Sequence, residues 1–433
     1  MSSISLAQRL AVGGSLPRLS VQERAPIRIG ALVPMTGPEE RWGRPGVDGC
    51  QLWVDWINAH GGMMLDGRRH LVELVVQDSA LGNVQTLRAA RQMVESQRVR
   101  LMLTLGGDDM DLALAYLMDR RVLTATLLPS DLSPDHPCLI APAEVHPFFV
   151  VTGVEWLARH RPQARRVALC SQTDRMGLPS LAVYRAAFGV AGQEIVKEVL
   201  YDSEAPDARA IVAQMMASGA DVLCWCSSAP PMIKELTQAA FDAGFAGEIL
   251  SCTCDNYPEL IARTSADFME RVTFQFPDFD DPKLAEADFF FSRPRAFFDS
   301  YAARFPNDWT AVSWEYAAIL DLWHDAVETS ESLQTGPVLA ALKRGRRMPH
   351  VFGLANWWGT EVFGIDNALV GDWPVVAIRQ GRARIQEFGS VLNWLEAHAE
   401  RLQAELSRVD QLWHQRVKPD LAQALAKQTS VAP

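Results

Sequence analysis

The sequence predicts an α/β protein with two Rossmann-like lobes and a helical extension at the C-terminus. Strand-like runs alternate with helix-length amphipathic segments, which is typical of parallel sheets covered by helices. The length of 433 residues exceeds the roughly 250 to 300 residues that one hydrophobic core usually serves, so two cores are expected. Strands are predicted at residues 27–31, 72–78, 101–105, 122–127, 167–170, 222–225 and 247–251.

The segment from Ile27 to Gly62 has the order strand, turn, helix and glycine stop. Ile27, Ile29 and Ala31 alternate as in a strand, and apolar residues at helical spacing follow later. A Pro-Met-Thr-Gly turn at residues 34–37 separates the two, and the helix ends in Ile-Asn-Ala-His-Gly-Gly at residues 57–62. A loop that faces a ligand is therefore expected between the strand and the helix.

This order of motifs resembles the type I periplasmic-binding-protein family, in its branch of leucine/isoleucine/valine receptors of ABC importers. The similarity continues through residues 72–78, 91–94, 101–107, 222–240 and 316–319, and so covers about residues 27–390. The resemblance implies non-enzymatic binding of a small solute between two lobes that close about a hinge. It also implies an ABC permease as partner, or a regulatory protein in the case of cytosolic relatives that act as amide sensors.

The family joins its lobes by three crossovers, and proline-containing breaks fit this pattern near residues 141–143, 276–278 and 348–350. Proline disfavours helix at the residue before it, so each break is interpreted as a connector. The expected organisation is an N-terminal extension, two lobes with the solute between them at the carboxyl ends of their strands, and a C-terminal helical extension. The predicted bounds are 1–26 for the N-terminal extension, 27–141 and 278–348 for lobe 1, 142–277 and 349–390 for lobe 2, and 391–433 for the C-terminal extension.

The C-terminal extension carries one helical stripe of apolar residues, formed by Leu395, Leu402, Leu406, Val409 and Trp413. The stripe is too short to be identified as a coiled coil. Packing on its own lobe is one interpretation. A seam with a partner helix, or with a second copy in a homodimer, is the other.

Composition argues against two classes of partner. The formal charge of −11 and the lack of a clustered basic face argue against nucleic acid. The sequence contains no run of 18 apolar residues, so membrane insertion is not predicted.

The cellular compartment is indicated by two further features. The odd number of cysteines, seven, fits an oxidising compartment poorly, and Gln8, Arg9 and Arg18 interrupt any N-terminal signal segment. These features favour the cytoplasm and a ligand sensor, whereas the family norm is a periplasmic receptor whose signal would be missing from this sequence.

Asp108 and Asp109 occupy the loop where amino-acid-binding relatives hold the ligand carboxylate with serines. A carboxylate beside another carboxylate in a closed cleft is repulsive. The expected ligand is therefore an amine, amide, polyol or aromatic compound rather than a simple branched-chain amino acid. The alternative role for Asp109 is to cap a helix at residues 110–118.

The resemblance assigns the remaining candidate positions. Trp42 would cover the ligand with its indole ring, and Asp255 lies near the acidic residue that pairs with a ligand ammonium. Trp314 and Tyr316 begin a helix that can border the cleft, with ordinary core packing as the alternative. The other candidate ligand contacts are Leu128 and Ser130 in lobe 1 and Met176 and Ser228 in lobe 2.

Four cysteines form a rival hypothesis: Cys224, Cys226, Cys252 and Cys254. Thiols two apart on neighbouring strands share a face, and four of them can hold zinc or an iron–sulfur cluster. The spacing is not the Cys-x-x-Cys of common zinc sites, and Cys often packs as a small core hydrophobe. The motifs of nucleophile elbows, metalloproteases and phosphate loops are missing from the sequence. No enzyme activity and no cofactor are therefore expected.

Overall fold

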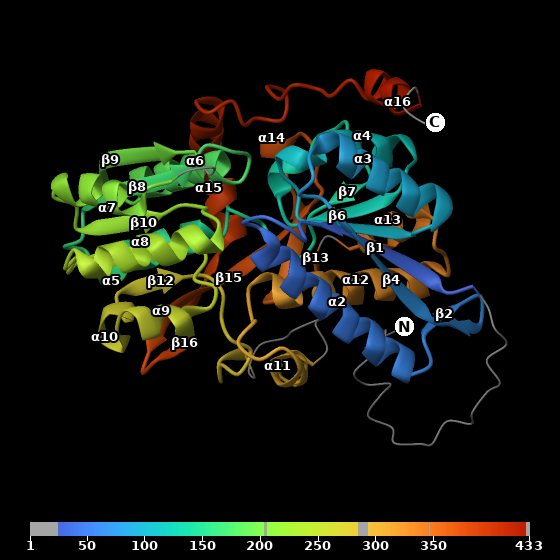
Figure 1. Ribbon diagram of the computed structural model, residues 1–433, viewed down its shortest axis with the longest axis horizontal. Coiled ribbons are helices and arrows are strands. Elements are labelled where there is room, and N and C mark those ends of the chain that lie inside the picture. The colour runs from blue at the N-terminus through green and yellow to red at the C-terminus, as the bar shows by residue number, and fades with distance from the viewer. Residues whose placement is uncertain (1–24, 203–205, 285–292, 346, 430–433) are drawn as a thin grey trace.

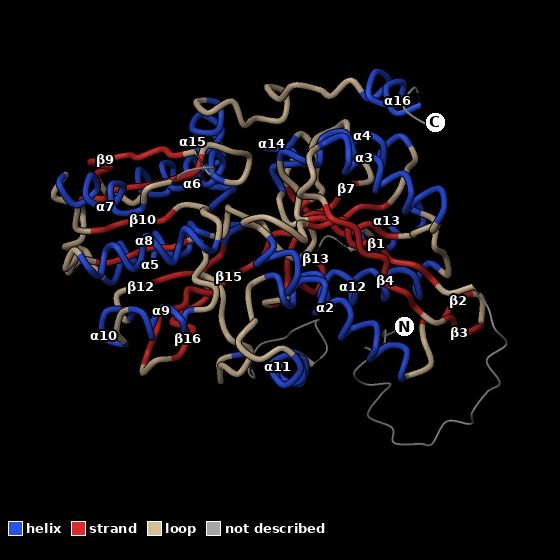
Figure 2. Tube along the Cα trace, viewed as in Figure 1, coloured by secondary structure: helices blue, strands red, loops and turns tan. Residues whose placement is uncertain are grey.

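The computed structural model describes residues 25–202, 206–284, 293–345 and 347–429. Two lobes lie side by side in Figure 1, and each consists of a sheet with helices packed on it. Figure 2 shows the strands of each lobe running inside a layer of helices. The predicted class, α/β with two Rossmann-like lobes, is confirmed.

The sheet of lobe 1 is parallel and has the strand order β4-β1-β5-β6-β7. Strand β1 is internal because it pairs with β4 on one side and β5 on the other. Its residues Ile29, Ala31 and Val33 are buried. Its strands are β1 (Ile27–Val33), β4 (Val72–Asp78), β5 (Leu101–Thr104), β6 (Leu123–Thr126) and β7 (Leu139–Ile140), beside a small hairpin of β2 (Met63–Leu65) and β3 (Arg68–His70). Its helices are α2 (Glu40–Ala59), α3 (Asn83–Arg91), α4 (Asp111–Asp119), α11 (Pro294–Arg304), α12 (Val312–Ser330) and α13 (Thr335–Leu342), with short helical turns at Gln92–Ser96, Asp108–Met110 and Pro129–Asp131.

The sheet of lobe 2 has the order β9-β8-β10-β11-β12-β15-β14-β13, and β16 also pairs with β15. Strands from β9 to β12 are parallel, and the strands after them are antiparallel. Its strands are β8 (Arg166–Gln172), β9 (Glu194–Tyr201), β10 (Val222–Trp225), β11 (Glu248–Ser251), β12 (Val272–Phe274), β13 (Arg347–His350), β14 (Gly353–Trp358), β15 (Ala368–Arg379) and β16 (Arg382–Ser390). Its helices are α5 (Val150–His160), α6 (Gly177–Val190), α7 (Ala208–Ala217), α8 (Pro230–Asp242), α9 (Tyr257–Arg263), α10 (Ala266–Met269) and α14 (Thr360–Phe363).

The chain passes between the sheets at residues 141–149, in the segment after β12, and along β15. Backbone hydrogen bonds of Ala141 with Asn367 and Leu369 fasten the first crossing to the start of β15. Residues 348–350, predicted as a connector, lie in the paired strand β13, with Pro349 at the edge of the sheet; their role in joining the lobes stays a prediction. Proline is tolerated at such an edge strand, since no neighbour needs its missing N–H.

The C-terminal extension begins with helix α15 (Val391–Ser407), which packs on α6 and β15 of lobe 2. The interpretation that it packs on its own lobe is therefore confirmed. The prediction of one continuous helical stripe is wrong beyond Leu406, because the helix ends before Val409 and Trp413. The chain then runs over to helix α16 (Leu421–Thr429) beside α4 of lobe 1 (Figure 1). None of the described helices could cross a membrane.

Helices α2 and α12 approach each other closely in lobe 1, and glycines allow that approach. A Cβ atom added at Gly49 would lie 1.9 Å from the backbone oxygen of Ser313. At Gly46 it would lie 2.7 Å from the ring of Tyr316. The position of α2 matters for the site, because its first turn carries Trp42.

We expect Gly49→Ala to push α2 away from α12, since overpacking of this kind costs about 1 to 3 kcal/mol. The midpoint of thermal unfolding should fall by several degrees. The matched control is Gly336→Ala in α13, where an added Cβ meets no atom within 4 Å. Equal midpoints for the two variants would contradict the close packing.

Candidate functional site

The two lobes are joined directly by Trp42 and Asp255. Trp42 on α2 donates its indole N–H to Oδ2 of Asp255 at 2.7 Å, and the backbone N–H of Ala311 donates to Oδ1 at 2.9 Å. Both donors come from lobe 1, whereas Asp255 follows β11 of lobe 2. Burial raises the pKa of Asp255, and these two hydrogen bonds oppose that shift. In this closed arrangement the carboxylate is satisfied by protein donors.

A second connection is made by Arg175, which follows β8 of lobe 2 and inserts among carboxylates of lobe 1. Its Nη2 donates to Oδ1 of Asp131 at 3.0 Å, its Nη1 pairs with Asp111, and its backbone N–H donates to Oδ2 of Asp108 at 3.2 Å. The Arg175 side chain is 13% exposed and that of Asp131 is fully buried. A buried ion pair of this kind is sensitive to the loss of either partner.

The attraction between Arg175 and Asp131 offsets part of the cost of burying each charged group. Burial lowers the pKa of Arg175, but Asp131 and Asp111 outweigh it and raise that pKa overall. Burial raises the pKa of Asp131, while Arg175 counteracts this. Gly107 donates its backbone N–H to Oδ2 of Asp131 at 3.2 Å. At Gly106 an added Cβ would meet the same oxygen at 2.3 Å, so this position needs glycine.

Carboxyl groups of both lobes face each other beside Arg175. The pKa of Glu39 is raised to about 7, because burial and then the charges of Asp174, Asp109 and Asp108 disfavour its ionised form. Burial and the neighbouring Asp108 likewise raise the pKa of Asp109. The surroundings of Glu39 and Asp109 therefore disfavour further negative charge.

Asp109 does not cap a helix. The residues Asp108–Met110 form a single short turn, α4 begins at Asp111, and neither element receives a capping hydrogen bond from a side chain. Asp109 instead accepts the backbone N–H of Gly82, in the loop before α3. The capping interpretation is wrong because the helix starts one residue later than the sequence pattern predicts.

A third set of polar contacts surrounds His146, in the segment 141–149 where the chain first crosses between the sheets. His146 Nε2 lies 2.8 Å from Oγ of Ser227, and its Nδ1 lies 3.6 Å from Glu144 and 3.9 Å from the Cys252 sulfur. Burial alone lowers the pKa of His146, but Cys252 and Glu144 raise it to about 10. Burial and Glu144 raise the pKa of Glu315 well above its usual range, which favours its neutral form.

The other predicted residues are buried. Leu128, Ser130, Met176 and Ser228 lie at the ends of strands that face the other lobe, and Ser228 hydrogen-bonds Tyr201. Trp314 and Tyr316 are fully buried. The ring of Trp314 packs against core rings, namely Phe279, Phe352 and Trp373.

The sequence pattern missed several residues of this region, although three of them adjoin predicted positions. Arg175 precedes Met176, Asp131 follows Ser130, and Glu315 lies between Trp314 and Tyr316. The signal that could have found them is a charged residue immediately after a buried strand or inside an apolar helix. The missed residues are Glu39, Asp111, Asp131, Glu144, His146, Asp174, Arg175, Ser227 and Glu315.

The described residues do not bring the four cysteines of the rival hypothesis together as metal ligands. No group of three or more His, Cys, Asp or Glu side chains in the described part of the chain could hold a metal ion. Strands β10 and β11 are neighbours as predicted, but β10 ends at Trp225 and β11 at Ser251. Cys224 and Cys226 do interact with each other, but Cys252 contacts Ser227 and His146 instead, and Cys254 lies beside Asp255.

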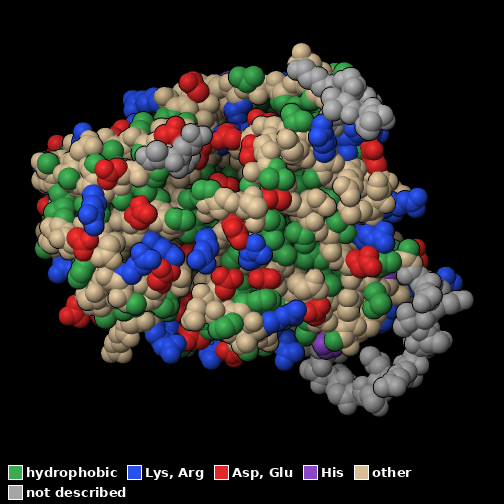
Figure 3. All heavy atoms as spheres, viewed as in Figure 1, with side chains coloured by type: hydrophobic (Ala, Val, Ile, Leu, Met, Phe, Trp, Pro, Cys, Tyr) green, Lys and Arg blue, Asp and Glu red, His purple; other side chains and the backbone are tan. Residues whose placement is uncertain are grey.

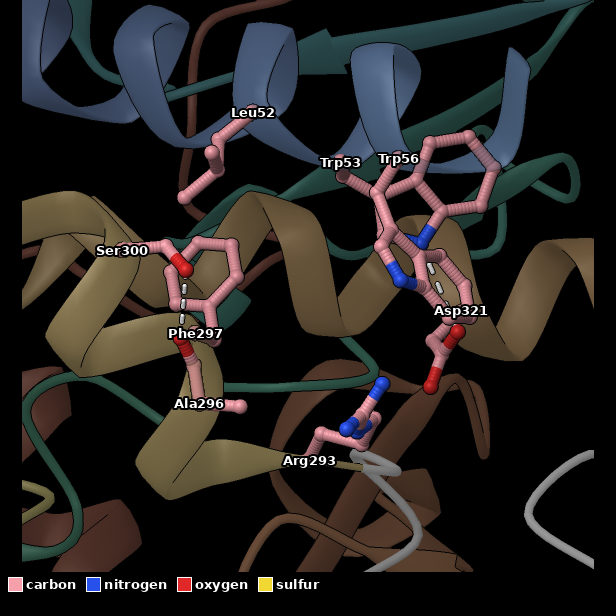
Figure 4. Close-up of a pocket in the computed structure, with 8 residues that line it drawn as sticks. All are labelled: Leu52, Trp53, Trp56, Arg293, Ala296, Phe297, Ser300 and Asp321. Atoms are coloured by element: carbon pink, nitrogen blue, oxygen red, sulfur yellow. Dashed lines mark hydrogen bonds between the residues drawn. The ribbon is translucent and has the colours of Figure 1, made fainter. Parts of the chain in front are cut away.

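Three of the cavities in the described part of the chain bear on where a solute could bind. The one beside Asp255 holds about 20 Å³, enough for about one water molecule. A cavity of about 410 Å³ is lined by Arg175 of lobe 2, by Asp111 and its neighbours in lobe 1, and by Trp413 and Arg416 of the C-terminal extension. A third, of about 270 Å³, lies within lobe 1 between α2, α11 and α12, with two indole rings on one side (Figure 4). Figure 3 shows charged side chains of both signs along the junction of the lobes.

Comparison with known proteins identifies the family. The family model described as periplasmic binding protein matches residues 26–383. The chain belongs to the periplasmic binding protein family. Members of this family are solute receptors that bind small molecules and work with ABC permeases.

Solved structures of such receptors share the fold. A leucine-binding protein from Thermotoga maritima is 18% identical, with a TM-score of 0.66 over 84% of this chain and 99% of that chain. A solute-binding protein from R. palustris in complex with benzoate is 10% identical, with a TM-score of 0.68 over 84% of this chain and 97% of that one. A substrate-binding protein from Aeropyrum pernix is 15% identical, with a TM-score of 0.69 over 88% of this chain and 99% of that one.

We expect Arg175→Ala to lower the free energy of unfolding by about 3 kcal/mol, because it removes the guanidinium that donates a hydrogen bond to the buried carboxylate of Asp131. The midpoint of thermal unfolding should fall accordingly. Arg159→Ala is the matched control, since Arg159 forms an exposed ion pair with Glu387 inside lobe 2 and such pairs contribute about 0 to 1 kcal/mol. A similar small effect for both variants would show that Arg175 does not join the lobes.

Proposed function

We propose that this protein is a receptor for a small organic solute that bears hydrogen-bond donors or positive charge, and that the solute binds between the lobes. The observation that carries the proposal is a group of carboxyl side chains at the junction of the lobes, namely Glu39, Asp108 and Asp109 of lobe 1 and Asp174 of lobe 2, beside the backbone contact of Asp108 with Arg175. An amine, amide or polyol supplies donors to such a surface. An aromatic ring would add contact with Trp42.

The ligands of structural neighbours suggest a competing class. One R. palustris protein was solved with benzoate and another with 4-hydroxybenzoate. In the present chain a ligand carboxylate at the loop of Asp108 and Asp109 would face two carboxyl groups, and charges of the same sign repel each other. We therefore expect amines and amides to bind more tightly than aromatic acids.

A thermal-shift screen against amino acids, amides, polyamines, polyols and aromatic acids tests the proposal. A solute at about 100 times its Kd adds roughly 2.7 kcal/mol of stability. The expected result is a hit among amines, amides or polyols that weakens at least tenfold in Asp108→Asn. Asp299→Asn on the exposed face of α11 is the control. A carboxylate hit that survives Asp108→Asn would contradict the acidic anchor.

The raised pKa of Glu39 gives a second prediction. A cationic solute favours the ionised carboxylate, so its affinity should rise as pH increases through about 7, the pKa of Glu39. Without solute, the stability of the folded protein depends on pH in the opposite direction. The folded state holds a proton that the unfolded chain loses near pH 4.5, so stability should fall as pH rises between 4.5 and 7. Titrations of wild type and Glu39→Gln at several pH values measure both effects. Identical pH slopes for the two proteins would rule out this role of Glu39.

A further inference from the structure

The C-terminal extension is attached to lobe 2 by helix α15. Leu395, Leu402 and Leu406 are buried, and the helix packs against α6 and β15. Arg401 lies so close to α6 that a Cβ added at Gly189 would meet its guanidinium at 2.0 Å. The Ser390 hydroxyl accepts the N–H of Asn393 and caps the first turn. The start of the extension therefore moves with lobe 2.

The residues after α15 are attached to lobe 1 instead. We call residues 408–429 the strap. Arg416 Nη2 donates to the backbone oxygen of Leu132 at 2.9 Å, and Lys418 pairs with Asp135 at 2.6 Å. The Trp413 ring lies beside Pro134 of lobe 1 and also beside Gly364, which follows α14 of lobe 2. Helix α16 packs against α4, as Figure 1 shows above lobe 1. The strap is thus a connection between the lobes in addition to the three crossovers.

The strap reaches the same ion cluster that closes the cleft. Arg416 and Arg175 line one cavity of about 410 Å³ together with Asp111. Burial and the nearby Arg175 lower the pKa of Arg416 to about 10, and Asp131 and Asp111 oppose that shift. Two guanidinium groups, one from lobe 2 and one from the strap, therefore lie near the same carboxylates of lobe 1.

This arrangement affects the energetics of opening. Rotation of the lobes about the crossovers must separate Arg175 from Asp131 and Trp42 from Asp255. It must also move α15 away from the lobe 1 surface on which the strap lies. Contacts that exist only in the closed form shift the equilibrium towards it. Because the strap is covalently tied to lobe 2, its contacts act at a high effective concentration.

We propose that the strap is a latch that keeps the cleft closed without solute, and that its release from Leu132 and Asp135 opens the cleft. A solute that enters the cavity beside Arg175 would then also contact the strap through Trp413 or Arg416. The proposal rests on the proposed function only in taking the cleft as the solute site. Closure itself can be measured without any solute.

The experiment measures the distance between the lobes. Spin labels at Gln85→Cys on α3 and Gln214→Cys on α7 report it by double electron–electron resonance, because both positions are exposed and all seven native cysteines are buried. The labelled full chain is compared, in the absence of solute, with the labelled chain ending at Ser407, which retains α15. We expect one short distance for the full chain and a shift to longer distances on truncation. The same distribution in both would overturn the proposal.

Full-length point variants keep the test decisive if the truncated chain folds poorly. Arg416→Ala and Trp413→Ala each remove one contact of the strap with lobe 1 and should lengthen the distance in part. Gln423→Ala, on the exposed face of α16, is the control and should not. If the solute screen is silent but the distances shift, the proposed function fails and the latch stands. If a solute binds but no strap variant changes the distance, the latch fails alone.

Discussion

The arrangement of the two lobes depends on the ion pair between Arg175 and Asp131. Asp131 has no access to solvent, and an isolated carboxylate in that position would be costly. The guanidinium that neutralises it comes from the other lobe, so the favourable electrostatic contact exists only while the lobes are closed. The hydrogen bond between Trp42 and Asp255 acts in the same direction at a second point. Closure is therefore built into the protein by side chains of both lobes.

The acidic character of the cleft follows from the same cluster. Arg175 is already engaged by Asp131, Asp111 and Asp108. The charges of Asp174, Asp109 and Asp108 raise the pKa of Glu39. Asp108 also raises the pKa values of Asp109 and Asp174. This acidic character is the basis for proposing a donor-bearing solute. The strap lies beyond residues 26–383, which the family model matches.

Much of the fold could be predicted from the sequence, because strands buried on both faces appear as short apolar runs between amphipathic helices. The runs at 27–31 and 72–78 form adjacent strands of one sheet. The site was harder to predict, because contacts across the cleft depend on loop geometry within one residue. Met176 was predicted and its neighbour Arg175 makes the contacts. The strap was missed because Val409 and Trp413 continue a helical pattern, although the helix ends at Ser407.

The most direct test of the account is the crystal structure of the protein with the best amine or amide from the solute screen. We expect ligand density between the lobes, within hydrogen-bonding distance of Asp108 or its acidic neighbours and next to the strap. Density instead in the aromatic cavity of lobe 1 between α2, α11 and α12 would contradict it.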